Sequence, residues 1–233
     1  MSVIEPTING TDFEDYSAKV VSYSIGPCDY EHGFIVPEGS MIPVKLKYAL
    51  GLRQVILVVD FEGEDENDIT DSIRMFIGEL HDGAEIALPD GYTYTCVYKK
   101  SSAPDEKAPW IQQVKFTLQG YRHGSLVSTT LSVSSPRSFS ITAQGDYRTP
   151  LLITITTTAS SISVMGVTIQ NISGTIKIDG YKKTVIQGSS TNKFGDTDLT
   201  EFPFFEPGSN SVPVQLASGN TATVEISYYP IYR

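Results

Sequence analysis

The chain has 233 residues, of which 40% are hydrophobic and 19% charged, a composition typical of a folded globular protein and not of a disordered one. It carries 17 Lys and Arg against 27 Asp and Glu, so its formal net charge is −10 at pH 7. Nucleic acid and anionic membranes bind clustered cations, so neither is expected as a direct partner. No run approaches the ~20 consecutive apolar residues of a membrane-spanning helix.

The first residues and the two cysteines are considered for what they predict about the cellular compartment. The first ten residues, MSVIEPTING, are neither basic nor continuously apolar, so no secretory signal is predicted and the chain is expected to fold in a cytoplasm. In that reducing compartment Cys28 and Cys96 are predicted to be free, buried thiols. The Asn-x-Ser/Thr sequons at Asn9 and Asn171 then carry no information on glycosylation.

The first quarter of the chain predicts strands followed by a breaker-rich segment. Asn9-Gly10 is a turn signal between two short strands. Residues 26–43 contain three prolines and three glycines, which indicates a long loop or an irregular hairpin arm. Apolar and β-branched runs predict strands at 19–25, 44–50 and 54–61.

One amphipathic helix is predicted at about 67–82, between two strands. Its apolar residues recur at helical spacing and form one stripe: Ile69, Ile73, Phe76, Ile77 and Leu80. Asn67 or Asp68 is expected to cap the start of the helix, and Gly83 suits the left-handed residue after its last turn.

Only strands, and no further helix, are predicted in the rest of the chain. Strands are predicted near 85–88, 92–100 and 110–120, with a turn at Asp90-Gly91 and a polar loop at 101–110. After Ser134 the charged residues become sparse and short alternating strands follow one another. The sequence therefore predicts a mainly β protein with two domains. Residues 1–134 form a β-rich domain with one embedded helix, and residues 135–233 form a β-sandwich of galectin-like or jelly-roll-like type.

Residues that carry chemistry are few. None of His32, His81 and His123 has a second ligand at zinc spacing, and structural roles are expected for all three. The acidic run between residues 60 and 71 lacks the order of an EF-hand and is interpreted as a solvated loop with helix-start carboxylates. Nucleophile elbows and phosphate-binding glycine loops are absent from the sequence. No catalytic, cofactor-binding or metal-binding residue is predicted, although sequence alone leaves a pair of glycosidase carboxylates open.

Aromatic residues in the second half raise a sugar-binding alternative, because flat rings stack on pyranose rings. The residues are Phe139, Tyr147, Tyr181, Phe194, Phe202, Phe204, Phe205, Tyr228, Tyr229 and Tyr232. Most are expected to fill the sandwich core or lie on strand faces. Trp110, the only tryptophan, lies in the first half. A carbohydrate-binding module would require an exposed aromatic platform within residues 138–233.

The order of these segments resembles the phage distal tail protein family of siphophage-type tails and prophage elements. VILVVDFEG at 55–63, the helix, and IALPDGYTYTCVYKK at 86–100 resemble the strand, helix and strand of the family's N-terminal domain. The segment 202–232 is similar to the family's closing pattern, with a Pro-Gly-Ser-Asn turn at 207–210. Residues 26–43 depart from the family pattern because they lack its usual "P-G-r-x-G" stretch.

The resemblance implies a structural role without catalysis or a cofactor. Such proteins form a hexameric ring that joins the tail tube protein to the tail-associated hub protein. The expected location is therefore the virion tail tip, after assembly in the cytoplasm of the bacterial host. The alternative from the residues is a carbohydrate-binding β-sandwich module that attaches to a host or cell surface, and the two roles are compatible.

Overall fold

The computed structural model describes residues 5–35 and 44–233, with the backbone alone for 29–35 and 44–50. The chain divides into two compact units. The N-terminal unit comprises Met1–His123 together with Arg233, and the C-terminal unit comprises Gly124–Tyr232. Each unit is built around its own hydrophobic core.

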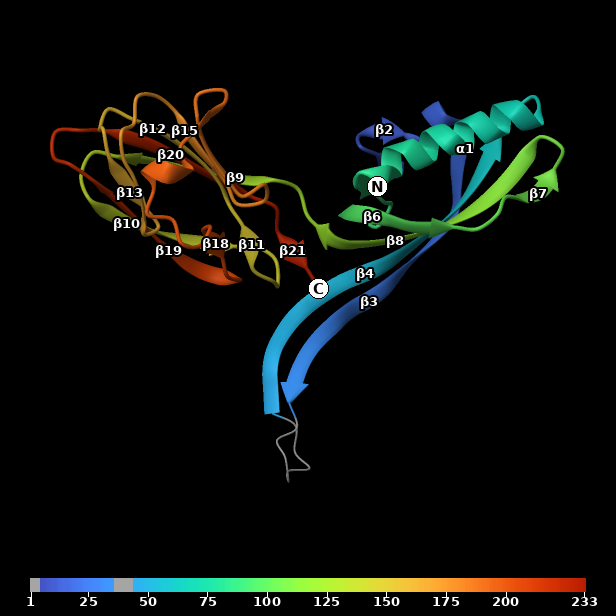
Figure 1. Ribbon diagram of the computed structural model, residues 1–233, viewed down its shortest axis with the longest axis horizontal. Coiled ribbons are helices and arrows are strands. Elements are labelled where there is room, and N and C mark those ends of the chain that lie inside the picture. Colours follow the sequence, from blue (N-terminus) through green and yellow to red (C-terminus); the bar gives the residue numbers. More distant parts are fainter. Residues whose placement is uncertain (1–4, 36–43) are drawn as a thin grey trace. The chain divides into compact units, whose positions relative to one another are not determined.

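The N-terminal unit is an antiparallel sheet with the strand order β2-β1-β5-β6-β8-β4-β3, and β7 pairs with β8 (Figure 1). The strands are β1 (Thr7–Ile8), β2 (Thr11–Asp12), β3 (Ala18–Ile35), β4 (Val44–Glu62), β5 (Ala84–Ala87), β6 (Thr93–Ser101), β7 (Asp105–Ala108) and β8 (Ile111–His123). A short 3-10 helix at Phe13–Tyr16 precedes β3.

The α-helix α1 (Glu66–His81) covers one face of this sheet (Figure 1). The predicted helix is confirmed, but the predicted cap at Asn67 or Asp68 is wrong. The Asp65 side chain accepts hydrogen bonds from the backbone N–H groups of both of these residues, at 2.8 and 3.0 Å. The cap is therefore Asp65, two residues before Asn67, where a carboxylate also meets the positive end of the helix dipole. Gly83 has φ +95°, as its predicted role after the helix requires.

The core of the N-terminal unit lies between α1 and the sheet. Alternate residues of β4 and β8 point toward the helix, and these are fully buried: Val55, Leu57, Val59, Phe61, Val114, Phe116 and Leu118. Phe76 of α1 is the centre of an aromatic cluster, with ring centroids 5.1 Å from Phe13 and Phe116, 5.5 Å from Phe61 and 5.8 Å from Tyr16. Edge-to-face and tilted contacts of this kind add to the burial energy of each ring.

Strands in the N-terminal unit are longer than the sequence pattern predicts. β4 is continuous through Gly51, where a break was expected between two strands, because β3 pairs with it along most of its length. β3 runs on from the predicted 19–25 to Ile35, and residues 36–43 of the predicted arm lie outside the described residues. The loop at 101–110 contains β7, which pairs with β8. Pairing between strands thus overrides local turn signals.

The C-terminal unit is a β-sandwich, so the predicted fold class is confirmed. One sheet has the order β10-β19-β13-β14 and the other β17-β16-β15-β12-β20-β9, while β11 pairs with β18. The strands are β9 (Val127–Val133), β10 (Arg137–Ala143), β11 (Thr149–Pro150), β12 (Leu152–Thr157), β13 (Ile162–Val164), β14 (Val167–Ile169), β15 (Ile176–Asp179), β16 (Thr184–Gln187), β17 (Thr191–Asn192), β18 (Phe204–Phe205), β19 (Gly208–Leu216), β20 (Ala222–Tyr228) and β21 (Ile231–Tyr232). Inward-facing Ile, Val and Leu side chains from both sheets form one core.

The division between the units falls after His123, whereas the sequence predicts a boundary after Ser134. The difference is strand β9, which pairs along its whole length with β20 near the end of the chain. Such long-range pairing leaves no trace in local composition. The shift in composition at Ser134 marks the turn between β9 and β10 and not the start of the sandwich.

The predicted turn at 207–210 lies at the start of β19. Gly208 has φ +91°, as expected. Asn210 acts through its side chain instead: its Nδ2 donates to the carbonyl oxygens of Glu206 and Gly208 at 2.7 and 2.9 Å, and its Oδ1 accepts from the Glu206 N–H. These bonds fix the reversal into the strand.

Replacing Phe76 with alanine is expected to lower the free energy of unfolding of the N-terminal unit by about 3–5 kcal/mol, because it removes the buried centre of the aromatic cluster. The measurement is urea unfolding followed by the fluorescence of Trp110, the only tryptophan. The matched control is Met75→Ala, since Met75 is the neighbouring residue on α1 and is 54% exposed. Equal effects of the two substitutions would contradict the central role of Phe76.

Candidate functional site

The β3–β4 ribbon is the first surface with functional character. β4 pairs with β8 only from Arg53 to Glu62, whereas its pairing with β3 continues to Val44. We call the paired backbone of Tyr30–Ile35 and Val44–Leu50 the arm (Figure 1). Among the described residues no third strand pairs with the arm.

Two consequences follow from this pairing. The arm has unpaired backbone N–H and C=O groups along both of its edges, and β3 is also the end strand of the sheet. Such edges add strands from other chains. A two-stranded ribbon is also marginally stable by itself in water. The arm is therefore a strong candidate for contact with another chain.

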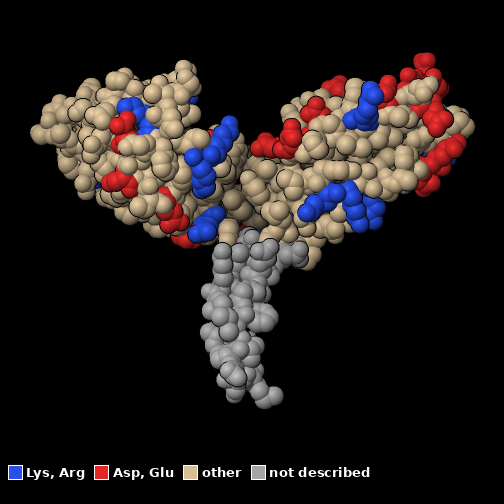
Figure 2. All heavy atoms as spheres, in the orientation of Figure 1, with Lys and Arg blue, Asp and Glu red and all other residues tan. Residues whose placement is uncertain are grey.

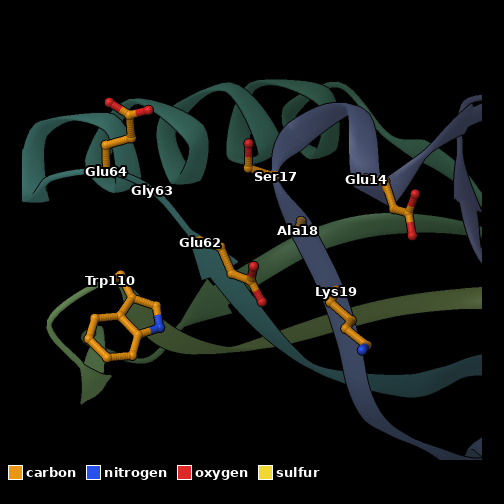
Figure 3. Close-up of a pocket in the computed structure, with 8 residues that line it drawn as sticks. All are labelled: Glu14, Ser17, Ala18, Lys19, Glu62, Gly63, Glu64 and Trp110. Carbon is orange, nitrogen blue, oxygen red and sulfur yellow. The ribbon is translucent and has the colours of Figure 1, made fainter.

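A second surface is a cavity of about 560 Å³ in the N-terminal unit (Figure 3). The residues that line it include Trp110, Lys19, Glu14, Glu62 and Glu64. Trp110 is 59% exposed. All four charged side chains are exposed as well.

Backbone contacts hold this cavity together. The Gly63 N–H donates to the Trp110 carbonyl oxygen at 3.2 Å, and the Glu62 N–H donates to the Ser17 carbonyl oxygen at 2.9 Å. A Cβ atom on Gly63 would lie 2.8 Å from Cγ1 of Ile69, so only glycine fits without a shift of the helix start. The end of β4, the start of α1 and the turn before β8 are thereby fixed against one another.

The chemistry of the Trp110 cavity suits docking better than catalysis. An exposed indole beside carboxylates favours a cationic side chain, through cation–π and charge-assisted contacts. General acid–base pairs usually need at least one carboxyl group shielded from water, and here all three carboxylates are exposed. Figure 2 shows further acidic side chains over the same end of the N-terminal unit.

The three histidines belong to different elements, β3, α1 and β8. His81 is exposed in the last turn of α1. His123 is buried, with its Nε2 atom 3.1 Å from the Thr95 hydroxyl oxygen. The side chain of His32 lies outside the described residues. In the described part of the chain no group of three or more His, Cys, Asp or Glu residues could hold a metal ion.

Both cysteines are free, as predicted. Cys96 is 1% exposed, and burial raises the pKa of its thiol to about 12. Cys28 is only half-buried, so the prediction that both thiols are buried is wrong for this residue. Cys28 lies on β3, the end strand of the sheet, which explains its partial exposure.

The aromatic residues of the C-terminal unit are mostly not a surface platform. Phe205 and Tyr228 are buried, with ring centroids 5.5 Å apart. Phe202 and Phe204 are half-buried, and Phe194 is 45% exposed. The expectation that most of these rings fill the core or line strand faces holds for Phe205 and Tyr228, and Phe139 and Phe202 are partly buried against the same core, whereas Phe194 is exposed.

Solved structures share this fold. The SPP1 Dit protein, described as a paradigm of the hub adsorption apparatus in phages that infect Gram-positive bacteria, matches with a TM-score of 0.70 and 14% identity, over 98% of this chain and 99% of that one. A chain of the phage P2 baseplate in its activated conformation with Ca matches with a TM-score of 0.59 and 10% identity, over 94% and 92%. The phage p2 baseplate with Sr gives 0.56 and 11%, over 93% and 92%.

No protein-family model and no curated protein matches the chain. At these identities the likeness shows the fold alone. The chain has the fold of phage distal tail and baseplate proteins across both units, which confirms at that level the resemblance seen in the sequence. In the described residues no helix is long and apolar enough to cross a membrane.

The environment of Cys96 predicts selective thiol chemistry. In a Cys28→Ala variant, the Cys96 thiol is expected to resist a disulfide-exchange reagent at pH 8 until the protein is unfolded, because the thiolate is the reactive form and burial disfavours it. Released chromophore measures the reaction. The reciprocal variant Cys96→Ala keeps the half-buried Cys28, which should react in the folded state. Rapid reaction of native Cys28→Ala would contradict the burial of Cys96.

Proposed function

We propose that this protein is a non-enzymatic structural component of a phage or prophage tail tip or baseplate. Copies of it form a ring, six in number, that joins the tail tube to the tail-associated hub or host-adhesion apparatus. The observation that carries the proposal is the whole-chain likeness to the SPP1 Dit protein, which spans both units. A likeness over one unit would fit many unrelated proteins with a β-sandwich.

The arm supports the ring. It offers long unpaired edges to a second copy, and a contact between an arm and a different surface of the next copy is heterologous. Heterologous contacts generate a closed ring when the rotation between copies closes. Strand addition would also stabilise a ribbon that has only two strands of its own.

The charges of the N-terminal unit support a docking role. The Trp110 cavity and the acidic surface around it fit a basic segment of a neighbouring tail protein, since opposite charges steer encounter and fix orientation. This surface also fits the proposal that the protein makes no direct contact with nucleic acid or membrane. The proposed location is the virion tail tip, with assembly in the host cytoplasm.

The arm gives a direct test of assembly. A variant in which Asn-Gly replaces residues 29–52 joins Cys28 to Arg53, two residues that are paired across β3 and β4. Asn-Gly forms a two-residue hairpin turn, so the rest of the sheet should fold. In size exclusion coupled to light scattering at high concentration, the full chain is expected to reach six times its 25.5 kDa mass, and the shortened variant to stay a monomer.

Two results would count against this role of the arm. One is a full chain that stays monomeric at high concentration and also with the tail tube protein added, which is the behaviour of a lone carbohydrate-binding module. The other is a shortened variant that still forms rings. Urea unfolding of the variant, followed by Trp110 fluorescence, controls for damage to the sheet.

A further inference from the structure

The C-terminal unit contains a cavity of about 280 Å³. This cavity has no part in the contacts proposed for the arm. Its walls combine two cations, one carboxylate and three aromatic rings: Arg148, Lys183, Glu201, Tyr147, Phe202 and Phe204. Three segments far apart in the sequence contribute these side chains. A volume of this size accommodates about one sugar ring, near the lower limit for small-molecule sites.

Strand pairing builds the cavity. β11 pairs with β18, with Thr149 opposite Phe205 and Pro150 opposite Phe204. The Thr149 hydroxyl donates to the Tyr229 carbonyl oxygen at 2.7 Å, which ties β11 to the end of the chain. Arg148, directly before β11, is thereby held close to Phe204 on β18.

A fixed turn carries the second cation. The Asp179 carboxylate accepts hydrogen bonds from the backbone N–H groups of Tyr181 and Lys182, at 2.9 and 2.8 Å. Lys183 follows in the left-handed region, with φ +58°. This turn between β15 and β16 places the Lys183 ammonium group 5.0 Å from the centroid of the Phe202 ring.

Aromatic rings, and not carboxylates, position both cations. The Arg148 guanidinium lies 5.4 Å from the centroid of Phe204, in the same relation as Lys183 to Phe202. Neither cation forms an ion pair with any residue that the structure describes. The wall of the cavity thus carries two cations against one carboxylate, in a protein whose net charge is −10. That arrangement favours an anionic group.

Glu201 limits which anionic ligands the cavity favours. Its carboxylate would repel a bare phosphate ion, but it accepts hydrogen bonds from hydroxyl groups. The exposed parts of Phe202 and Phe204 suit the C–H groups of a sugar ring. A sugar ring that carries an anionic group can contact the cations, the carboxylate and the aromatic rings of the cavity. An inorganic anion can contact only the cations.

We propose that this cavity binds a saccharide that carries a phosphate or carboxylate group. Arg148 and Lys183 bind the anionic group, Glu201 accepts from ring hydroxyls, and Phe202 and Phe204 contact the ring. The inference goes beyond the assembly role, because it gives the C-terminal unit a ligand of its own. It does not depend on that role, since binding can be measured in any state of assembly.

The test is isothermal titration of the full chain with four probes: glucose 6-phosphate, glucuronic acid, glucose and inorganic phosphate. At least one of the two anionic sugars is expected to bind at about 10 mM or below, and the one that binds more tightly identifies the anionic group. Glucose and inorganic phosphate are each expected to bind about tenfold more weakly or more, because each loses one set of charge-assisted or polar contacts.

Variants assign the residues. Arg148→Gln and Lys183→Gln are each expected to weaken binding about tenfold, since each removes a charged donor. The matched control is Lys182→Gln: Lys182 is the exposed neighbour of Lys183 and does not line the cavity, so its loss should leave affinity unchanged. Glu201→Gln should bind inorganic phosphate more tightly than the native chain does and reduce the preference for the sugar phosphate.

Three results would overturn the proposal. The first is no heat of binding from either anionic sugar at about 10 mM. The second is equal affinity for glucose 6-phosphate and inorganic phosphate, which would leave an unselective anion site. The third is an equal loss in Lys182→Gln and Lys183→Gln, which would indicate diffuse attraction to surface charge. Unchanged thermal unfolding of each variant separates loss of contact from loss of fold.

Discussion

The packing of Phe76 against the sheet is the contact on which the N-terminal unit depends. Its ring lies between the 3-10 helix, through Phe13, and the strands β4 and β8, through Phe61 and Phe116. Because this one helix provides the cover for that face, the inner part of the β3–β4 ribbon is anchored in a dry core. The arm continues from that anchored part, and its open edges are the reason to expect a partner.

Local signals predicted much of the fold. The stripe that contains Phe76 and the glycine after α1 are short-range patterns, and each appears in the structure as predicted. The errors lie where long-range pairing decides. Gly51 reads as a break but lies inside β4, because β3 supplies hydrogen bonds on either side of it. The segment that forms β9 was predicted to belong to the first domain, but β9 pairs with β20 of the sandwich.

The sites were much less accessible to prediction. Trp110 was conspicuous as the only tryptophan, yet its proximity to Glu14 and Lys19 depends on the return of β3 beside β4. The cations of the C-terminal cavity, Arg148 and Lys183, carry no motif at all. They meet because β11 pairs with β18 and because a turn fixed by a carboxylate projects a lysine over a ring. Neither the strand pairing nor the position of this turn can be predicted from the spacing of these residues along the sequence.

The central claim is that copies of this chain close into a ring at a phage tail tip. Negative-stain imaging of the full chain at high concentration, with class averages of the largest species, tests it most directly. The account predicts a six-fold ring with a central opening. Isolated particles of one chain, unchanged when the tail tube protein is present, would contradict it.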